Sequence, residues 1–304
     1  MLASTKNILK RAHLGGYAVA HFNINNMEIL QAVVRAAEKM RAPIIAATSE
    51  GAIKYAGIEY LYSLAQTAAR ISKVPIALHL DHGTNLETVK KAIQIGYSSV
   101  MYDGSHLNFE QNVEITREIV KLAHKKGIAV EAELGTIGGA EDEIKSRQII
   151  YTDPMMAELF VKRTGCDFLA VAIGTSHGAY KFSGKTSLRQ DILKEIKERV
   201  KIPLVLHGAS GVPAAVVRQA KEYGAELTGV YGVSNSQIKE AIKNGVNKIN
   251  TDTDLRLAFD AAVRKFVKTK PKDFDPRHIL SPARDKIQKV AEERIKLFGS
   301  RNKA

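Results

Sequence analysis

Short apolar runs alternate with longer amphipathic segments along most of the chain. One unit, an amphipathic helix followed by a short basic turn and an apolar strand, recurs at residues 31–48, 63–80, 118–134 and 192–208. Uninterrupted apolar runs are typical of strands buried on both faces, whereas apolar positions three and four apart form one face of a helix. The alternation therefore predicts βαβ units around a parallel sheet.

The number of these units favours a closed barrel. A chain of 304 residues accommodates one (β/α)8 barrel, which typically takes about 250 residues. No G-x-G-x-x-G follows the first strand and no Walker A motif is present, which argues against a doubly wound nucleotide-binding sheet. We expect one α/β domain over residues 1–304, a TIM barrel with a C-terminal helical extension. The expected strands lie near residues 17–23, 42–48, 74–80, 97–102, 127–133, 167–173, 202–206 and 245–250, and a helix is expected at 253–269.

Two segments depart from the bare barrel. A long polar connection near residues 134–153 follows the fifth strand, and a connection of this length is typical of a lid or a disordered segment. We expect a mobile lid there. The C-terminal tail near residues 271–304 ends in an amphipathic pattern that predicts a helix opened by Ser281 and Pro282. That helix either packs on its own barrel or reaches a neighbouring subunit.

The composition limits the location and the redox chemistry of the protein. No apolar stretch approaches the roughly 20 residues of a membrane span, and no signal-peptide pattern opens the chain, so a cytoplasmic location is expected. The single cysteine, Cys166, excludes an intrachain disulfide and a multi-cysteine zinc site. No activating base accompanies it in the sequence, so it reads as a structural thiol.

The formal net charge of +13 suits anionic partners. However, lysines and arginines are spread over helix faces, no basic block is interleaved with aromatic residues, and there is no tryptophan. This distribution favours phosphorylated metabolites as partners over a dedicated nucleic-acid or membrane surface.

Three apolar strands each end in a histidine beside a glycine. The runs IALHLDHG, AVAIGTSHG and LVLHG deliver His82, His177 and His207 to the carboxyl ends of parallel strands, where α/β barrels place their active sites. Three neutral imidazoles and an open position are the arrangement of catalytic zinc. His79 lies one pleat deeper and is interpreted as structural. His21 lies at the end of the first strand, and the sequence alone does not assign it a role.

Carboxylates accompany these histidines at the same rim. Asp81 adjoins a predicted ligand and can serve as a general acid or base. Asp103 and Glu133 end the fourth and fifth strands; each alone could be a helix cap or ion-pair partner, and together they could hold a second cation or a displaced first one. Glu131, one pleat deeper, could orient a ligand from behind.

Two stretches could bind an oxyanion. The small residues 208–211 offer backbone amides that can converge on a phosphate. The last strand ends at Asn250, and the residues that follow are strong helix N-caps, which explains them without a ligand. The sharper interpretation is a phosphate at that helix N-terminus, with Thr253 as a donor. Asp252 and Asp254 would repel it, so they are expected to point away or to cap.

Together these residues resemble a known family, the class II zinc-dependent fructose-bisphosphate aldolases. The resemblance covers nearly the whole chain and implies reversible cleavage of fructose 1,6-bisphosphate to dihydroxyacetone phosphate and glyceraldehyde 3-phosphate, a step of glycolysis and gluconeogenesis. The motifs that carry it are AVAHFNINN, TSEGAIKYAG, HLDHG, SVMYDGSH, EAELG, VAIGTSHGAYK, LVLHGASG, KINTDTDLRLAF and FDPRHILSPAR.

The resemblance also implies roles for single residues. It assigns the three histidines to zinc, Asp81 to the proton donor, and Asp103 and Glu133 to a second or displaced metal position. Glu141, the glutamate of GGAED, would handle the proton at the nucleophilic carbon. Arg277 would act within its own subunit or across to a partner. The implied substrate contacts are Asn23, Ser49, Gly178, Lys181, Gly208, Ala209, Ser210, Asn250, Thr251, Asp252, Thr253 and Arg277.

Further implications concern cofactors and assembly. Besides catalytic Zn²⁺, the resemblance leaves room for a second divalent cation and for a monovalent K⁺ or Na⁺. It implies a homodimer or homotetramer. His21 and Tyr102 stand where family members more often carry small or aliphatic residues.

Three alternatives stay open at this point. A tagatose 1,6-bisphosphate aldolase shares the motifs and the chemistry and differs in stereochemistry at one carbon. A metal-dependent hydrolase on the same barrel would use zinc hydroxide and would not need two phosphate sites. The positive charge leaves a nucleic-acid-binding role as the third alternative.

Overall fold

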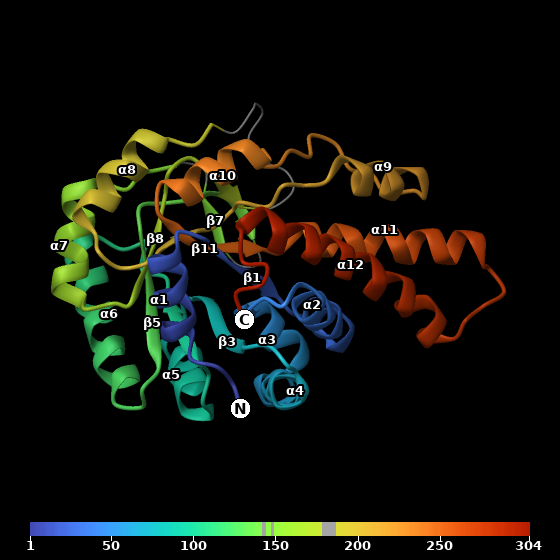
Figure 1. Ribbon diagram of the computed structural model, residues 1–304, viewed down its shortest axis with the longest axis horizontal. Helices are drawn as coiled ribbons and strands as arrows, with labels where there is room; N and C mark the ends of the chain where they lie inside the picture. The colour runs from blue at the N-terminus through green and yellow to red at the C-terminus, as the bar shows by residue number, and fades with distance from the viewer. Residues whose placement is uncertain (142–143, 147–148, 178–186) are drawn as a thin grey trace.

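Eight parallel strands form a closed ring in the order β1-β11-β10-β8-β5-β4-β3-β2 (Figure 1). The structure is a computed structural model, and it describes residues 1–141, 144–146, 149–177 and 187–304. Each strand overlaps one predicted from the apolar runs, so the barrel prediction is confirmed. The strands are β1 (Val19–Asn23), β2 (Ile44–Ser49), β3 (Ile76–Gly83), β4 (Ser99–Tyr102), β5 (Ala129–Leu134), β8 (Phe168–Val171), β10 (Leu204–Leu206) and β11 (Val246–Thr251).

Helices lie around this ring, and side-chain caps fix where several of them begin. Asn26, Asn85, Asn108 and Asp153 each accept a hydrogen bond from a backbone N–H of the first turn that follows, which satisfies a donor that the helix leaves unpaired. The helices are α1 (Thr5–Gly15), α2 (Met27–Met40), α3 (Glu50–Ala56), α4 (Ile58–Ile71), α5 (Leu86–Ile95), α6 (Phe109–His124), α7 (Pro154–Thr164), α8 (Gln190–Arg199), α9 (Ala214–Glu222), α10 (Asn235–Lys243), α11 (Thr253–Thr269) and α12 (Pro276–Phe298).

Two apolar cores hold the barrel. The larger lies between the strands and the surrounding helices. The smaller fills the amino-terminal half of the barrel interior, where α1 contributes Ile8, Leu9 and Ala12 and closes that end. Its strand residues are Val19, Ile45, Ala77, Ala129, Phe168, Ala170 and Val205.

The carboxyl-terminal half of the interior is polar. Side chains two residues apart on a strand share one face, so four strands each place a pair of polar side chains inside. The first member of each pair is fully buried, and we call this set the inner tier; the second member lies nearer the strand end, and we call that set the rim tier. The inner tier is His21, His79, Glu131 and Lys248, and the rim tier is Asn23, Asp81, Glu133 and Asn250.

The expected lid near residues 134–153 contains strands of its own. β6 (Gly138–Glu141) pairs antiparallel with β7 (Ile144–Ser146) and parallel with β9 (Ser176–His177). The connection is therefore tied to the stretch that follows β8. Residues 142–143 and 147–148 of the expected lid lie outside the described residues, and its mobility stays a prediction.

The C-terminal helix begins earlier than the sequence suggested. α12 starts at Pro276, and Pro282 lies inside it, so the expected start at Ser281 and Pro282 is wrong. The reason is a stronger start signal upstream: the Asp275 side chain accepts from the Arg277 N–H at 2.9 Å, and a proline at the first helical position costs no hydrogen bond.

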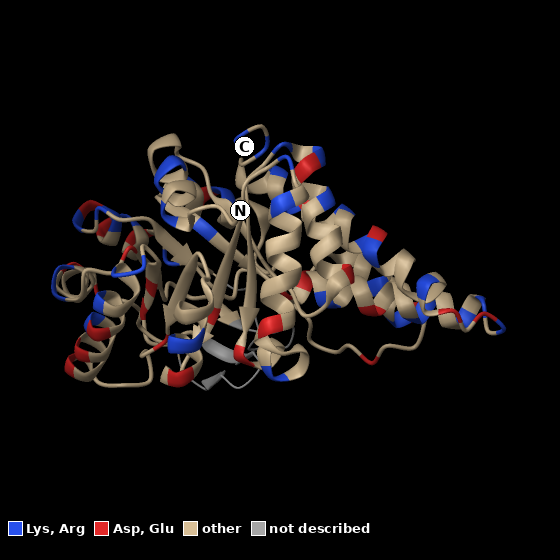
Figure 2. Ribbon diagram, turned by 90° about the horizontal axis from the view of Figure 1, so that it is seen from below, with Lys and Arg blue, Asp and Glu red and all other residues tan. Residues whose placement is uncertain are grey.

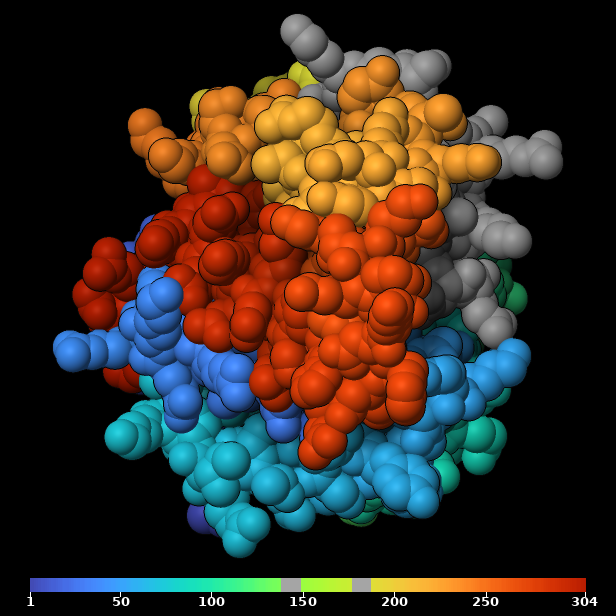
Figure 3. All heavy atoms as spheres, turned by 90° about the vertical axis from the view of Figure 1, so that its right-hand side faces the viewer, coloured from blue at the N-terminus to red at the C-terminus, as the bar shows by residue number. Residues whose placement is uncertain are grey.

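The paired helices α11 and α12 form an arm that extends away from the barrel (Figure 1). Seen from its far end, the arm stands beside α2 (Figure 3). Phe274 at the tip is 90% exposed, and the Arg277 side chain is 85% exposed. These two exposed side chains give the tip an apolar and a cationic group.

Charged side chains of both signs are interspersed over the helices (Figure 2). This agrees with the spread of lysines and arginines read from the sequence. Within the part of the chain that the structure describes, no helix combines the length and the apolar character that a membrane crossing requires.

Candidate metal centre at the barrel rim

The end of β3 is bent so that two neighbouring residues face the site. The pairing register with β4 shifts between Leu80 and Gly83, which marks a bulge, and His82 has a φ of 46°. A regular strand would turn His82 away from the side that Asp81 faces, and the bulge brings both inward. A left-handed backbone costs a non-glycine residue about 1–2 kcal/mol, and such strain concentrates at functional sites.

The imidazoles of His82 and His207 face each other inside the rim. His82 Nε2 lies 2.6 Å from His207 Nδ1, and the rings meet edge to face. The other nitrogen of each ring contacts a carboxylate: His82 Nδ1 lies 2.8 Å from Asp103 Oδ2, and His207 Nε2 lies 2.8 Å from Glu131 Oε1. A carboxylate behind each imidazole is the usual arrangement of metal-binding histidines.

These contacts test whether the residues suit a cation. If each ring donates its outer N–H to its carboxylate, the two inner nitrogens present lone pairs to each other. Two lone pairs 2.6 Å apart repel, so at this separation a proton lies between them, and an ion bound by both nitrogens at about 2.0–2.1 Å would require the rings to move apart. Burial alone would lower the pKa of His82, but the neighbouring carboxylates raise it to about 10, so these surroundings favour a positive charge at this ring. The donor set therefore fits a divalent cation with imidazole ligands.

Asp81 lies beside this pair and is held by two amides. Asn23 Nδ2 donates to Asp81 Oδ2 at 2.8 Å, and Asn250 Nδ2 donates to Asp81 Oδ1 at 3.0 Å. Burial would raise the pKa of the Asp81 carboxyl, but the imidazoles of His21, His82 and His207 hold it well below the usual value. Asp81, His82 and His207 offer ligand atoms within 4.8 Å of one another.

Asp103 and Glu133 have different environments although both are buried. Asp103 faces His82 and also accepts from the Ser105 amide at 3.1 Å and hydroxyl at 2.6 Å. These contacts outweigh burial and lower the pKa of Asp103. Burial and the charge of Asp103 raise the pKa of Glu133 well above its usual value. Together with His82 they offer a second group of ligand atoms within 4.8 Å, as the expected displaced metal position requires.

The loop after β10 is shaped by backbone geometry and a buried ion pair. Gly208 has a φ of 60°, and a Cβ there would lie 2.7 Å from the Ser176 carbonyl oxygen, so only glycine fits. Asp254 accepts from the Val212 amide at 2.7 Å and the Gly211 amide at 3.2 Å, and it pairs with Arg294 Nε at 2.9 Å. Asp254 thus points at the loop amides.

The start of α11 presents further polar groups beside this loop. Asp252 occupies the N-cap position but makes no side-chain cap bond, and it pairs with Arg256 at 2.7 Å. The hydroxyl of Thr251 is buried and has no hydrogen-bond partner among the described residues.

Several predicted site residues lie away from the His82–His207 pair, or their side chains lie outside the described part of the structure. His177 ends β9, and Glu141 ends β6, but their side chains lie outside the described part, as do Gly178 and Lys181. Ser49 accepts from the Ala52 N–H at 3.2 Å and caps α3. The remaining predicted residues Ala209, Ser210 and Thr253 follow the ends of β10 and β11, and Arg277 lies on the arm.

Two residues of this region were missed by the sequence reading. Lys248 is fully buried and contacts Glu131, with Nζ 2.9 Å from its Oε2. Its signal was available, since a lysine inside a buried strand two residues before Asn250 must point the same way. Arg294 reaches Asp254 from α12, and nothing in the local sequence marks it.

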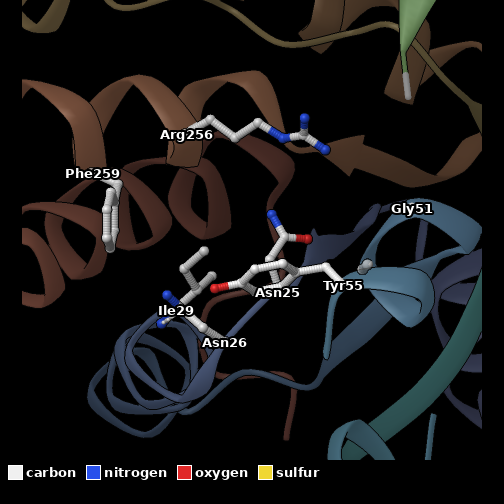
Figure 4. A pocket seen from close by; sticks show the side chains of 8 residues that line it. Asn25, Asn26, Ile29, Gly51, Tyr55, Arg256 and Phe259 are labelled. Atoms are coloured by element: carbon white, nitrogen blue, oxygen red, sulfur yellow. Dashed lines mark hydrogen bonds between the residues drawn. The ribbon is translucent and has the colours of Figure 1, made fainter. Parts of the chain in front are cut away.

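A cavity of about 440 Å³ opens beside the rim. Arg256 and Phe259 approach it from α11, Tyr55 from α3, and Asn25 from the turn before α2 (Figure 4). Asn25 lies two residues after Asn23 of the rim tier. The cavity is lined by Asn25, Asn26, Ile29, Gly51, Ala52, Tyr55, Arg256 and Phe259.

The fold and the site define a (β/α)8 barrel with a candidate metal centre of histidines and carboxylates at its carboxyl rim. Residues 3–303 match the family described as "Fructose-bisphosphate aldolase class-II". The chain belongs to this family, and it is accordingly an aldolase, a carbon–carbon lyase. The resemblance read from its motifs is confirmed.

Relatives match over the full length. The chain is 47% identical over 306 residues to a fructose-bisphosphate aldolase of Thermus caldophilus and 46% identical over 306 residues to one of Helicobacter pylori, and both alignments cover the whole of each chain. Among solved structures, the YdjI aldolase from Escherichia coli K12 superposes with a TM-score of 0.82 at 36% identity, over all of both chains.

Proposed function

We propose that this protein cleaves fructose 1,6-bisphosphate reversibly to dihydroxyacetone phosphate and glyceraldehyde 3-phosphate with the help of zinc, as in glycolysis and gluconeogenesis. The observation that carries the proposal is the pair of inner nitrogens of His82 and His207, 2.6 Å apart, beside the amide-held carboxylate of Asp81. His177, at the end of β9, is the third proposed ligand. When bound, zinc supplies a Lewis acid that polarises the substrate ketone and stabilises negative charge.

Asp81 and Glu141 carry the proposed proton transfers. In cleavage, Asp81 takes the proton of the hydroxyl whose carbon becomes the aldehyde. The carbon–carbon bond breaks, and its electron pair stays with the dihydroxyacetone phosphate half. Glu141 then supplies a proton to that carbon. The two amides of Asn23 and Asn250 orient the Asp81 carboxylate for its part in this exchange.

The two phosphates call for two anion sites. The first is proposed at residues 208–210 and at residues 250–253, where β11 ends and α11 begins; Gly178 and Lys181 are proposed to complete it. The second is proposed in the cavity of Figure 4, which is lined by Arg256 and by Asn25 and Gly51, two residues beyond Asn23 and Ser49 in the chain. Two anion sites, one of them with Arg256, suit a bisphosphate better than an unphosphorylated ester or amide.

The exposed side chains on the arm support the proposed assembly into an oligomer. Arg277 is proposed as a substrate contact, yet it stands 85% exposed at the tip of the arm, so it would serve the site of a second copy. Exposed Phe274 at the same tip suits burial against that copy. We therefore propose a homodimer or a homotetramer. A second divalent cation at Asp103 and Glu133, a monovalent K⁺ or Na⁺ and a cytoplasmic location stay predictions.

The test combines metal analysis with cleavage assays on fructose and tagatose 1,6-bisphosphate. We expect one tightly bound zinc per chain, cleavage that a chelator abolishes, and preference for the fructose substrate. Asp81→Ala should keep zinc and lose most turnover, whereas His207→Ala should lose both. A preference for tagatose 1,6-bisphosphate would replace the proposed substrate, and near-normal cleavage by Asp81→Ala would overturn the proton-transfer assignment.

A further inference from the structure

Lys248 is a fully buried lysine in the middle of the inner tier. Its Nζ lies 3.0 and 2.9 Å from the two carboxylate oxygens of Glu131 and 2.9 Å from Asn250 Oδ1. The layer below it consists of small and aliphatic residues together with Phe168, so the charged groups of the interior begin at the inner tier. A buried ion pair stabilises less than apolar packing does, and its retention calls for another reason.

The contact of Lys248 with Glu131 connects it to the metal centre. Glu131 Oε1, held by the Lys248 ammonium, lies 2.8 Å from His207 Nε2. A carboxylate in this position accepts the Nε2–H, so the Nδ1 lone pair of His207 turns toward His82. Without the ammonium, the Glu131 charge would be uncompensated inside the barrel, and its orientation would no longer be fixed.

The contact of Lys248 with Asn250 connects it to Asp81, the proposed proton carrier. The oxygen of the Asn250 side chain accepts from the ammonium, so the amide nitrogen must be the atom that faces Asp81. That nitrogen lies 3.0 Å from Asp81 Oδ1 and 3.3 Å from His207 Nδ1. The Asp81 carboxylate can only accept and so also selects the amide nitrogen, while the ammonium holds the oxygen at the other end of the amide. Without the ammonium, the amide would keep only its donor contacts to fix its position.

We propose that Lys248 is a positioning residue that orients His207 through Glu131 and Asp81 through Asn250, and so couples the metal site to the proton carrier. The inference rests on the proposed roles of His207 and Asp81. The Lys248 ammonium contacts Glu131 and Asn250, and it acts on His207 and Asp81 only through these two side chains.

The test is Lys248→Met, which keeps the length of the side chain and removes the charge. The metal-free protein is titrated with zinc alone in competition with a chromophoric chelator, and kcat and KM are measured separately. We expect zinc affinity to fall about 10- to 100-fold, as substitutions behind a ligand usually cause. We also expect kcat at saturating zinc to fall at least tenfold, with KM changed less than threefold.

A matched control separates positioning from loss of stability. Leu61→Ala removes a fully buried side chain on α4, a helix that contributes no residue to the inner tier or the rim tier, and destabilises the fold through a cavity. It should bind zinc within about threefold of the wild type. If it loses as much zinc affinity as Lys248→Met, or if Lys248→Met binds zinc and turns over as the wild type does, the inference is overturned.

A second variant covers the case in which Lys248→Met does not fold. Glu131→Gln combined with Lys248→Met removes both buried charges and keeps an acceptor for His207. We expect it to fold and to keep the kcat defect, since Asn250 is still not held; wild-type kcat would overturn the inference. A wild type that binds no zinc would overturn the proposed function and this inference together, whereas zinc binding with unchanged variants overturns the inference alone.

Discussion

Asp254→Asn tests whether a buried charge holds the loop after β10. In the wild type, Oδ1 of Asp254 accepts from Val212, and Oδ2 serves both the Gly211 amide and Arg294 Nε. Asparagine keeps one acceptor for Val212, but its amide nitrogen then faces two donors. Arg294, with only 8% of its side chain exposed, loses its carboxylate partner.

The expected cost follows from burial. Removing one partner of a buried ion pair typically costs about 3–5 kcal/mol, which lowers Tm by roughly 6–10 °C in a chain of this size. Val212 has a φ of 47°, so its loop conformation depends on these bonds. We therefore expect KM for the bisphosphate to rise more than kcat falls, because Asp254 holds Gly211 and Val212, and the preceding residues 208–210 of the same loop are proposed to bind a phosphate.

The same substitution elsewhere on α11 provides the control. Asp260 pairs with Arg264 at 2.8 Å, but both side chains are 40% exposed, and a solvated pair contributes at most about 1 kcal/mol. Thermal unfolding and steady-state kinetics are measured for both variants. If Asp254→Asn and Asp260→Asn lie within about 2 °C of each other with equal KM, the reasoning from burial is refuted.

Three further predictions follow from local geometry. Gly208→Ala should lower kcat/KM at least about tenfold, since its Cβ would collide with the Ser176 carbonyl; unchanged kinetics would contradict this. Burial raises the pKa of Cys166 to about 12, so iodoacetamide at pH 8 should label it only after unfolding, as mass spectrometry can show. Burial, followed by the charge of Lys248, holds the pKa of His79 well below its usual value. The unfolded chain therefore binds a proton that the folded chain does not, and the free energy of unfolding falls as the pH drops below about 6.5. In denaturant unfolding at several pH values, His79→Gln should lose up to about 1.4 kcal/mol less per pH unit than the wild type, and equal slopes would refute the assignment.

Strand positions were predictable because their signal is local. An apolar run bounded by turn residues identified each barrel strand, and the histidines at the ends of these runs pointed to one rim, where His82 and His207 do meet. The bulge that turns both Asp81 and His82 inward was not predictable, because it depends on the pairing with β4.

Contacts between distant segments account for what was missed. Arg294 meets Asp254 only after α12 has packed against α11. The role of Lys248 depends on Glu131 from another strand. Each of these features requires the three-dimensional arrangement, because no single sequence segment contains both partners.

The closure of the barrel by α1 has a kinetic consequence. Ile8 and Leu9 seal the amino-terminal end with apolar packing, so an ion between His82 and His207 would exchange through the rim at which the sugar phosphate is proposed to dock. Bound substrate would then shield the ion from chelators. In the presence of a chelator, the rate at which the enzyme loses its metal would then depend on the fraction of time for which substrate occupies the rim. An enzyme that is turning over would therefore lose its metal more slowly than an idle one.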